Sequence, residues 1–170
     1  MTYNARSETA HEKPSYRAPW RARQWALAPM RSFFEPCWEE GAGNGGRAVR
    51  WQIGLADQAP FAVAGLWERW VQPQDGTVLD SFTLLTVNAD GHALMGHMHK
   101  PGEEKRMPVL IAEHDYRDWL QATPQSAASW MKSWPADQLQ GHAAPRAGKD
   151  LQSAQDLRGV APVAQNLSLF

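Results

Sequence analysis

The alternation of apolar and polar residues is strongest in the middle of the chain, where it predicts a series of β-strands. Residues 48–56 place an apolar side chain at every second position, namely Val49, Trp51, Ile53 and Leu55. This period of two is typical of a strand with one buried face, and we expect it to form a hairpin with the strand predicted at 61–70. An Asp-Gly turn at 75–76 then leads into a largely apolar strand at 82–87.

Shorter elements are predicted on both sides of these strands. Prolines interrupt the opening segment, so we expect extended pieces and at most one short helix over residues 1–24. A glycine-rich turn is expected at 41–46 and another turn at 88–91. The remaining elements are short strands at 25–30, 32–35 and 107–111 and short helices at 93–99, 113–120 and 126–134. Together they indicate an α+β fold with an antiparallel sheet.

The length of 170 residues and the composition, 43% hydrophobic and 21% charged, suit one folded domain. From residue 137 onward glycine, alanine, glutamine and proline are frequent, so we expect a domain over 1–136 and a mostly disordered tail over 137–170. No apolar run approaches the roughly 20 residues of a membrane-spanning helix, and the first residues lack a signal-peptide core. The single cysteine, Cys37, excludes an internal disulfide and a four-cysteine zinc site. We therefore expect a cytoplasmic protein without a membrane partner.

Charge is distributed unevenly along the chain, although the net charge is only −1. Residues 1–37 contain six basic and three acidic side chains, interleaved with Tyr16, Trp20 and Trp25. Cations and flat rings together suit a strand of nucleic acid, because cations meet phosphates and rings stack on bases. The alternative is a solvated surface beside buried tryptophans, and composition alone favours this second interpretation.

The residues alone give only weak signals of chemistry. Four histidines cluster between residues 92 and 114, but their spacing matches no zinc motif, so we expect neither a metal nor another cofactor. A metal-dependent hydrolase built on these histidines remains an alternative. Cys37 lies close to Glu35, Glu39 and Glu40, and nearby negative charge disfavours the thiolate that a nucleophile needs. The sequence also lacks a P-loop and a G-x-S-x-G motif.

Five short strings occur in one order along the chain: Asn4–Thr9 (NARSET), Phe33–Pro36 (FFEP), Ala64–Glu68 (AGLWE), Phe82–Thr86 (FTLLT) and Met98-His99 leading to Arg106–Val109 (RMPV). In this order they resemble the SOS-response-associated peptidase (SRAP) family, whose members recognise abasic sites in single-stranded DNA. The resemblance covers roughly residues 3–135. It implies a mainly antiparallel, barrel-like sheet with short flanking helices and a role in the DNA damage response.

The resemblance also implies a reaction. In the family that the chain resembles, an N-terminal cysteine attacks the ring-opened sugar aldehyde and closes a thiazolidine, which leaves a DNA–protein crosslink. The resemblance also implies a self-processing peptidase (hydrolase) activity. Carried over by motif, Asn4 orients the sugar, Glu35 acts as acid or base near the amine, and His99 relays protons to the opened sugar hydroxyl. Each also has a structural explanation: Asn4 capping a turn, Glu35 pairing with Arg31, and His99 capping a helix end.

Three further residues are implied as contacts to DNA. Arg6 would hold the flanking phosphate, since a guanidinium binds phosphate in a bidentate manner, and Thr86 and Arg106 would contact the DNA backbone nearby. The expected partner is single-stranded DNA with an abasic site. Bound to it, the protein would be associated with the nucleoid.

The sequence departs from the family pattern at its beginning and at one insertion. The family begins with Met-Cys-Gly-Arg and continues for a long stretch before its Asn-Ala-Arg string, whereas here Met1-Thr2-Tyr3 stands immediately before that string. In addition, Lys100–Lys105 separates His99 from Arg106. We expect an N-terminally truncated member that binds abasic single-stranded DNA but has lost crosslinking and peptidase activity. Unpaired sheet edges would lower its stability and permit self-association. The alternative function is a non-enzymatic protein-interaction module with an aromatic-rich surface.

Overall fold

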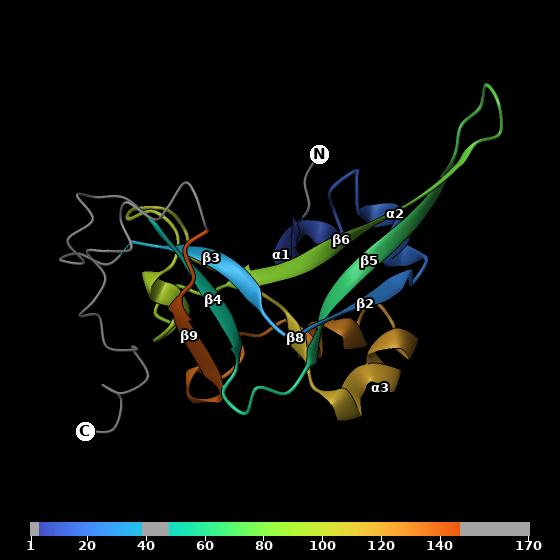
Figure 1. Cartoon of the computed structure of the whole chain (residues 1–170). Coiled ribbons are helices and arrows are strands. Elements are labelled where there is room, and N and C mark those ends of the chain that lie inside the picture. Colours follow the sequence, from blue (N-terminus) through green and yellow to red (C-terminus); the bar gives the residue numbers. More distant parts are fainter. Residues whose placement is uncertain (1–3, 39–47, 147–170) are drawn as a thin grey trace. The chain divides into compact units, whose positions relative to one another are not determined.

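The computed structural model describes residues 4–38 and 48–146. Its contacts divide the chain into two compact units, each of which holds a β-sheet (Figure 1). The first unit comprises Met1–Met30, Phe61–Val87 and Met107–Ser133, and the second comprises Arg31–Pro60, Asn88–Arg106 and Trp134–Phe170. The turn expected at 41–46 lies outside the described residues, as does the chain from residue 147 onward.

The first unit is built on a six-stranded, mainly antiparallel sheet (Figure 1). Its strands are β1 (Asn4–Arg6), β2 (Trp25–Met30), β5 (Phe61–Val71), β6 (Val78–Asn88), β7 (Arg106–Pro108) and β8 (Leu110–Ile111). They follow the order β1-β6-β5-β2, with β7 beside β6 and β8 beside β5. Residues 61–66 of β5 are all buried, and a strand covered on both faces carries an unbroken apolar run in place of alternation. The strands predicted at 25–30, 61–70 and 82–87 are therefore confirmed.

Short helices accompany this sheet. They are α1 (Ser7–Ala10), α2 (Arg17–Arg21), α3 (Tyr116–Gln121) and the 3-10 turns η2 (Glu113–Asp115) and η3 (Ser126–Trp130). The expectation of at most one helix before residue 24 is wrong. Pro19 lies in the first turn of α2, where a backbone N–H has no helical partner to lose, so it does not interrupt the helix.

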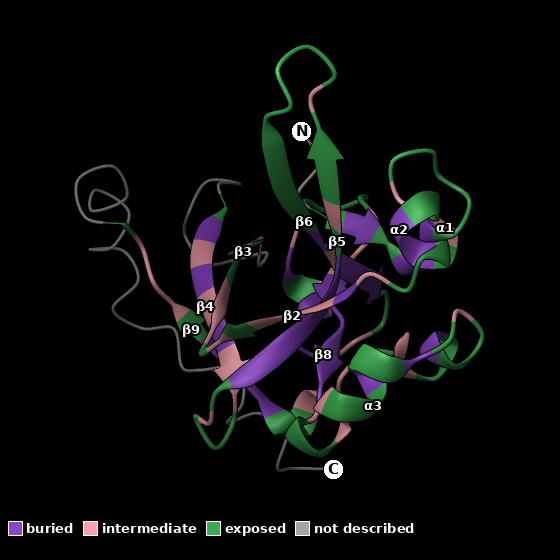
Figure 2. Cartoon of the chain, turned by 90° about the vertical axis from the view of Figure 1, so that its right-hand side faces the viewer, coloured by how far each residue is buried: buried purple, intermediate pink, exposed green. Residues whose placement is uncertain are grey.

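Four tryptophan rings form a connected cluster in the first unit. Trp20 contacts Trp25 edge to face at 5.0 Å, Trp25 contacts Trp119 at 5.0 Å, and Trp119 contacts Trp130 at 5.9 Å. The indole of Trp25 donates to the carbonyl of Ala122 at 2.8 Å. Trp20 and Trp25 are buried (Figure 2 shows buried residues in purple). The tryptophans interleaved with basic residues in the opening segment thus pack the interior, as the second interpretation of that segment held.

The second unit contains a three-stranded antiparallel sheet in the order β3-β4-β9. Its elements are β3 (Phe33–Cys37), β4 (Val49–Leu55), β9 (Leu139–Ala143) and the 3-10 turns η1 (Met95–His97) and η4 (Ala136–Gln138). The alternation predicted for β4 is confirmed, but its hairpin with residues 61–70 is wrong. Strand β4 pairs with β3 and β9, whereas β5 pairs with β2, β6 and β8. Alternation identifies the buried face of a strand and leaves its neighbour open.

Strand β9 falls within the range for which the sequence predicted a disordered tail. Its small residues are required by close packing: a Cβ on Gly141 would lie 3.1 Å from the Trp51 ring and 3.4 Å from Leu94. Beside it, the Gln140 amide donates to the Leu55 carbonyl at 3.0 Å. The glycine and alanine that resemble tail composition therefore belong, up to residue 143, to a sheet.

The α+β class with a mainly antiparallel sheet and short helices is confirmed. Among the described residues the hydrogen-bonded order of neither sheet closes on itself, so the barrel-like detail is not part of the observed fold. In the part of the chain that the structure describes, no helix has the length and apolar character needed to cross a membrane.

Gly65 allows the close packing at the centre of the first sheet. It pairs with Ala26 of β2 and Leu84 of β6, and an added Cβ would lie 2.6 Å from the Thr83 carbonyl oxygen. We expect Gly65→Ala to lower the free energy of unfolding by about 1–3 kcal/mol, because the strand backbone must shift to accommodate the methyl group. Gly96→Ala is the control, since its added Cβ meets nothing within 4 Å. Equal losses for the two variants in urea denaturation would contradict this explanation.

Candidate active site

Strand β3 presents a carboxyl group in surroundings that disfavour its charge. Glu35 lies opposite Trp51 in the β3–β4 register, two residues before the buried Cys37. Its side chain is 21% exposed. Burial raises the pKa of Glu35 above its ordinary value of 4.5, and the nearby His99 has a smaller effect in the opposite direction. The carboxyl group therefore retains its proton to a higher pH than an exposed glutamate does.

His99 is held beside this carboxyl group by its backbone and by its ring. Its N–H donates to the Pro36 carbonyl at 2.7 Å, and the preceding Met98 forms a bridge to Cys37. The backbone of His99 has a φ of +61°, the left-handed region that residues other than glycine rarely occupy. Backbone strain of this kind persists where surrounding contacts fix it, and it is frequent at functional sites.

The ring contacts of His99 indicate which ring nitrogen carries a hydrogen. Nε2 is 3.0 Å from the carbonyl oxygen of Arg106, and Nδ1 is 3.7 Å from Oε2 of Glu35. Because a carbonyl can only accept, Nε2 carries a hydrogen and donates it. Nδ1 then faces the Glu35 carboxyl group at 3.7 Å, an ion-pair distance that is longer than a hydrogen bond. This pair, with the raised pKa of Glu35, is suited to general acid–base catalysis.

A cavity of about 540 Å³ borders His99, lined by Trp38, Gly96, His97, His99, Pro101, Gly102 and Lys105. The insertion Lys100–Lys105 forms part of its wall. The Lys105 ammonium donates to the carbonyls of His99 at 3.1 Å and of Lys100 at 2.9 Å. Sequence reasoning missed Lys105 and the Pro36 carbonyl as supports of His99. Only their adjacency to the two motifs could have indicated them.

Arg106 supports His99 through its backbone. Its carbonyl accepts the His99 hydrogen bond, while its guanidinium pairs with Glu104 at 2.7 Å. The ion pair of Glu35 in the described residues is with His99 and not with Arg31. The structure thus brings Glu35, His99 and Arg106 together in the second unit. A phosphate-binding role for Arg106 stays a prediction.

The other three predicted residues lie together in the first unit. Asn4 and Arg6 are exposed and, two residues apart in β1, share one face of the strand, with the buried Ala5 between them. Strand β1 runs parallel to β6, and Arg6 is in register with Thr86. The buried Thr86 hydroxyl donates to the Ala5 carbonyl at 3.4 Å. That Asn4 and Arg6 share one cleft with the Glu35–His99 pair stays a prediction.

The remaining histidines of the cluster have other surroundings. His92 donates through Nε2 to the Trp134 carbonyl at 2.8 Å, and its Nδ1 accepts from the N–H groups of Leu94 and Met95. It therefore fixes the start of η1. Within the ranges that the structure covers, no group of three histidine, cysteine or carboxylate side chains is arranged to hold a metal ion.

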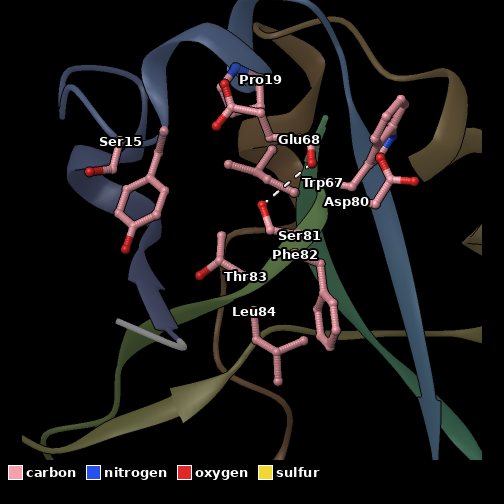
Figure 3. A pocket seen from close by; sticks show the side chains of 11 residues that line it. Ser15, Pro19, Trp67, Glu68, Asp80, Ser81, Phe82, Thr83 and Leu84 are labelled. Carbon is pink, nitrogen blue, oxygen red and sulfur yellow. Dashed lines mark hydrogen bonds between the residues drawn. The ribbon is translucent and has the colours of Figure 1, made fainter. Parts of the chain in front are cut away.

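A larger hollow lies in the first unit, at the base of the β5–β6 hairpin (Figure 3). It has a volume of about 670 Å³, and its lining includes Tyr16, Leu66, Trp67, Phe82 and Leu84. Trp67 is 40% exposed and Phe82 is 67% exposed, and the two face each other in the strand register. This is an exposed aromatic surface, and the residues that line it include no histidine–carboxylate pair.

Comparison with known proteins gives consistent matches. Residues 1–147 match the family model described as SOS response associated peptidase (SRAP). The chain is 30% identical over 142 residues to the abasic site processing proteins YoqW and YobE of Bacillus subtilis, covering 82% of this chain and 58% and 59% of those proteins. The chain thus spans less than two thirds of the length of these curated relatives.

Solved structures agree with these matches. A crystal structure from Bordetella bronchiseptica has a TM-score of 0.77 at 38% identity, covering 84% of this chain and 65% of that one. Another, from Bacteroides thetaiotaomicron, has a TM-score of 0.74 at 23% identity, covering 97% and 66%, and supports the fold alone. From the family match, the relatives and the fold together, the chain belongs to the SOS response associated peptidase (SRAP) family.

Proposed function

We propose that this chain binds single-stranded DNA at abasic sites in the DNA damage response. The observation that carries the proposal is the Glu35–His99 pair, in which a carboxyl group of raised pKa lies 3.7 Å from an imidazole that lines a cavity. The family match and the abasic site processing names of its relatives support it. We place the protein in the cytoplasm, associated with the nucleoid when it is bound to DNA.

The chemistry of the lesion explains why a carboxyl group and an imidazole side by side are useful. An abasic sugar interconverts between a closed hemiacetal and an open aldehyde, so a proton must leave one oxygen and reach another. In our proposal His99 relays the proton to the opened sugar hydroxyl, and Glu35 supplies or accepts it. Asn4 orients the sugar. The DNA backbone is held by Arg6, with Thr86 and Arg106 as further contacts.

We propose that the chain holds the lesion without a covalent bond. The family's crosslinking and self-processing peptidase activities depend on a cysteine nucleophile. The one cysteine of this sequence, Cys37, is 2% exposed in β3. A buried thiol beside Glu35 is unsuited to attack an aldehyde in DNA.

Binding to a fluorescent abasic oligonucleotide tests the proposal. We expect fluorescence anisotropy to show binding that weakens at least tenfold between roughly 50 and 200 mM salt, because phosphate contacts release counterions. The same mixture should give no shifted band on a denaturing gel. A denaturant-resistant band would show that crosslinking survives. An affinity insensitive to salt would contradict the proposed phosphate contacts, and no binding of the abasic oligonucleotide would contradict the proposed function.

The β5–β6 hairpin favours a second candidate function, a protein-interaction module. Its exposed apolar side chains are Trp67, Trp70, Val71, Val78, Leu79 and Phe82. Residues 67–82 carry three carboxylates and one guanidinium, and Arg69 is bound to Asp80 at 2.7 and 2.8 Å. Exposed apolar surface with net negative charge fits a protein partner better than phosphate. We place self-association at this hairpin too, and gel filtration at several protein concentrations tests it.

A further inference from the structure

The sheet of the second unit has a second face whose residues the proposed function does not use. Side chains alternate along a strand, so Phe34 and Glu35 lie on opposite faces of β3. Phe34 is in register with Gln52 of β4, and Gln52 with His142 of β9. These three residues form a row across the strands. We call the face that carries them, together with Arg50, the outer face.

The outer face combines a cation with a flat ring. The guanidinium carbon of Arg50 lies 3.3 Å from the centroid of the Phe34 ring. The Ala144 carbonyl fixes the guanidinium by accepting from Nη1 at 2.9 Å. Phe34 is nevertheless 43% exposed. The result is a rigid stack with an accessible edge and ring, the type of surface on which nucleic-acid bases stack.

A polar hollow of about 400 Å³ adjoins this row, lined by Arg31, Ser32, Gln52, Gly54, Leu55, Gln58, Gln140 and His142. Glycine at position 54 lets the backbone of Arg31 approach β4 closely, because a Cβ there would lie 2.9 Å from the Arg31 carbonyl oxygen. Gln58 at its rim has a φ of +62°, a strained backbone of the kind found at binding sites. Carboxamides both donate and accept, which suits the edges of bases.

The charge of the outer face has one sign. Arg31 and Arg50 contribute positive charge. None of the residues that line the hollow is a carboxylate, and Glu35 lies on the other face of its strand. Arg31 forms no ion pair with another described residue, and its side chain is exposed. A cationic surface of this kind attracts phosphate groups.

We propose that the outer face of the β3-β4-β9 sheet is a second binding surface, for undamaged single-stranded nucleic acid. A base stacks on the Phe34–Arg50 platform, the carboxamides of the hollow contact a neighbouring base, and Arg31 meets the phosphate between them. A bare anion site would not need the ring, and an acidic protein would not need the carboxamides. This surface requires no abasic sugar and does not depend on the Glu35–His99 chemistry.

Anisotropy with a short fluorescent oligothymidylate tests the proposal, because this probe has no lesion. Phe34→Ala is expected to weaken its binding about tenfold, the effect of losing one stacked base, while Phe34→Tyr keeps the ring and restores affinity. Arg31→Gln should reduce the salt slope by about one ion. Arg117→Gln, a charge removal at an exposed residue of α3, is the control and should leave both quantities unchanged. Circular dichroism verifies that each variant is folded.

The outcomes separate this proposal from the abasic-site function. Unchanged affinity in Phe34→Ala and Arg31→Gln, or no binding of the undamaged strand by the wild-type chain, would overturn the outer-face proposal even if abasic DNA is bound. Competition by polyglutamate as effective as that by oligothymidylate would also overturn it, since an acidic polypeptide offers charge without bases. Retained oligothymidylate binding in Glu35→Gln supports it, because the two faces then act separately.

Discussion

Glu35→Gln is expected to slow, on the order of 10²-fold, the reaction of an abasic aldehyde with free cysteine in the presence of the chain. Free cysteine supplies an amine and a thiol from solution, because Cys37, the one cysteine of the sequence, is buried. It condenses with the aldehyde to give a thiazolidine and one water molecule. The wild-type chain should accelerate this condensation because Glu35 and His99 act in it as acid and base. Mass spectrometry of the cysteine adduct on the oligonucleotide measures the rate.

The control for this substitution is Glu103→Gln in the loop that follows His99. Glu103 is exposed, so this variant removes the same charge from the same unit and leaves the Glu35–His99 pair intact. If both variants slow the condensation equally, net charge and not acid–base catalysis explains the effect. If neither does, the Glu35–His99 pair has no part in the chemistry.

The same substitution is expected to stabilise the fold, and the sign follows from the pKa. Burial raises the pKa of Glu35 above 4.5, so the carboxyl group favours the folded state below that pH. This contribution is lost as the pH rises through the raised value. Glutamine does not ionise, so its contribution to the free energy of unfolding does not change with pH. Glu35→Gln should therefore exceed the wild-type chain in free energy of unfolding by roughly 0.5–2 kcal/mol at pH 8, and the two should converge near pH 4. A wild-type chain that is more stable at pH 8 would contradict the burial of this charge.

Local pattern predicted the strands well, but it did not predict which strands become neighbours. The period of two in β4 identified its buried residues Val49, Trp51 and Ile53. It could not show that the strand pairs with β9, about 85 residues away. The composition of β9 resembled that of a disordered tail. Position 141 is glycine because the Trp51 ring packs closely against it, and not because the chain is flexible there. A local signal therefore fails where a residue is chosen by a distant neighbour.

The candidate site was predicted through motifs whose geometry no periodicity supplies. Glu35 and His99 lie 64 positions apart in sequence, and their proximity was expected only from the family resemblance. The left-handed backbone of His99 carries no sequence signal, since glycine is the residue that normally indicates it. Lys105 was unforeseen for a similar reason: its ammonium binds two carbonyls of the loop that contains it. Such contacts depend on loop conformation rather than on residue type.

Trp119→Ala is expected to cost about 3–5 kcal/mol of the free energy of unfolding, because Trp119 is the largest fully buried side chain among the described residues. Trp119 is 0% exposed, contacts the rings of Trp25 and Trp130, and donates through Nε1 to the Ala26 carbonyl at 2.9 Å. Trp119→Phe keeps most of the packing but leaves that carbonyl without its donor, so its loss should be about 1–3 kcal/mol. It remains measurable if the alanine variant does not fold.

Trp70→Ala is the matched control, because it removes the same side chain from a site that is 49% exposed on β5. We expect its free energy of unfolding in urea to stay within about 0.5 kcal/mol of the wild-type value. A loss as large as that of Trp119→Phe would mean that Trp70 is covered in solution. The hairpin would then already be occupied, by a second copy of the chain or by another part of it. A small loss leaves Trp70 available to a partner, so this pair of tryptophans distinguishes the side chain that maintains the fold from the one that serves a surface.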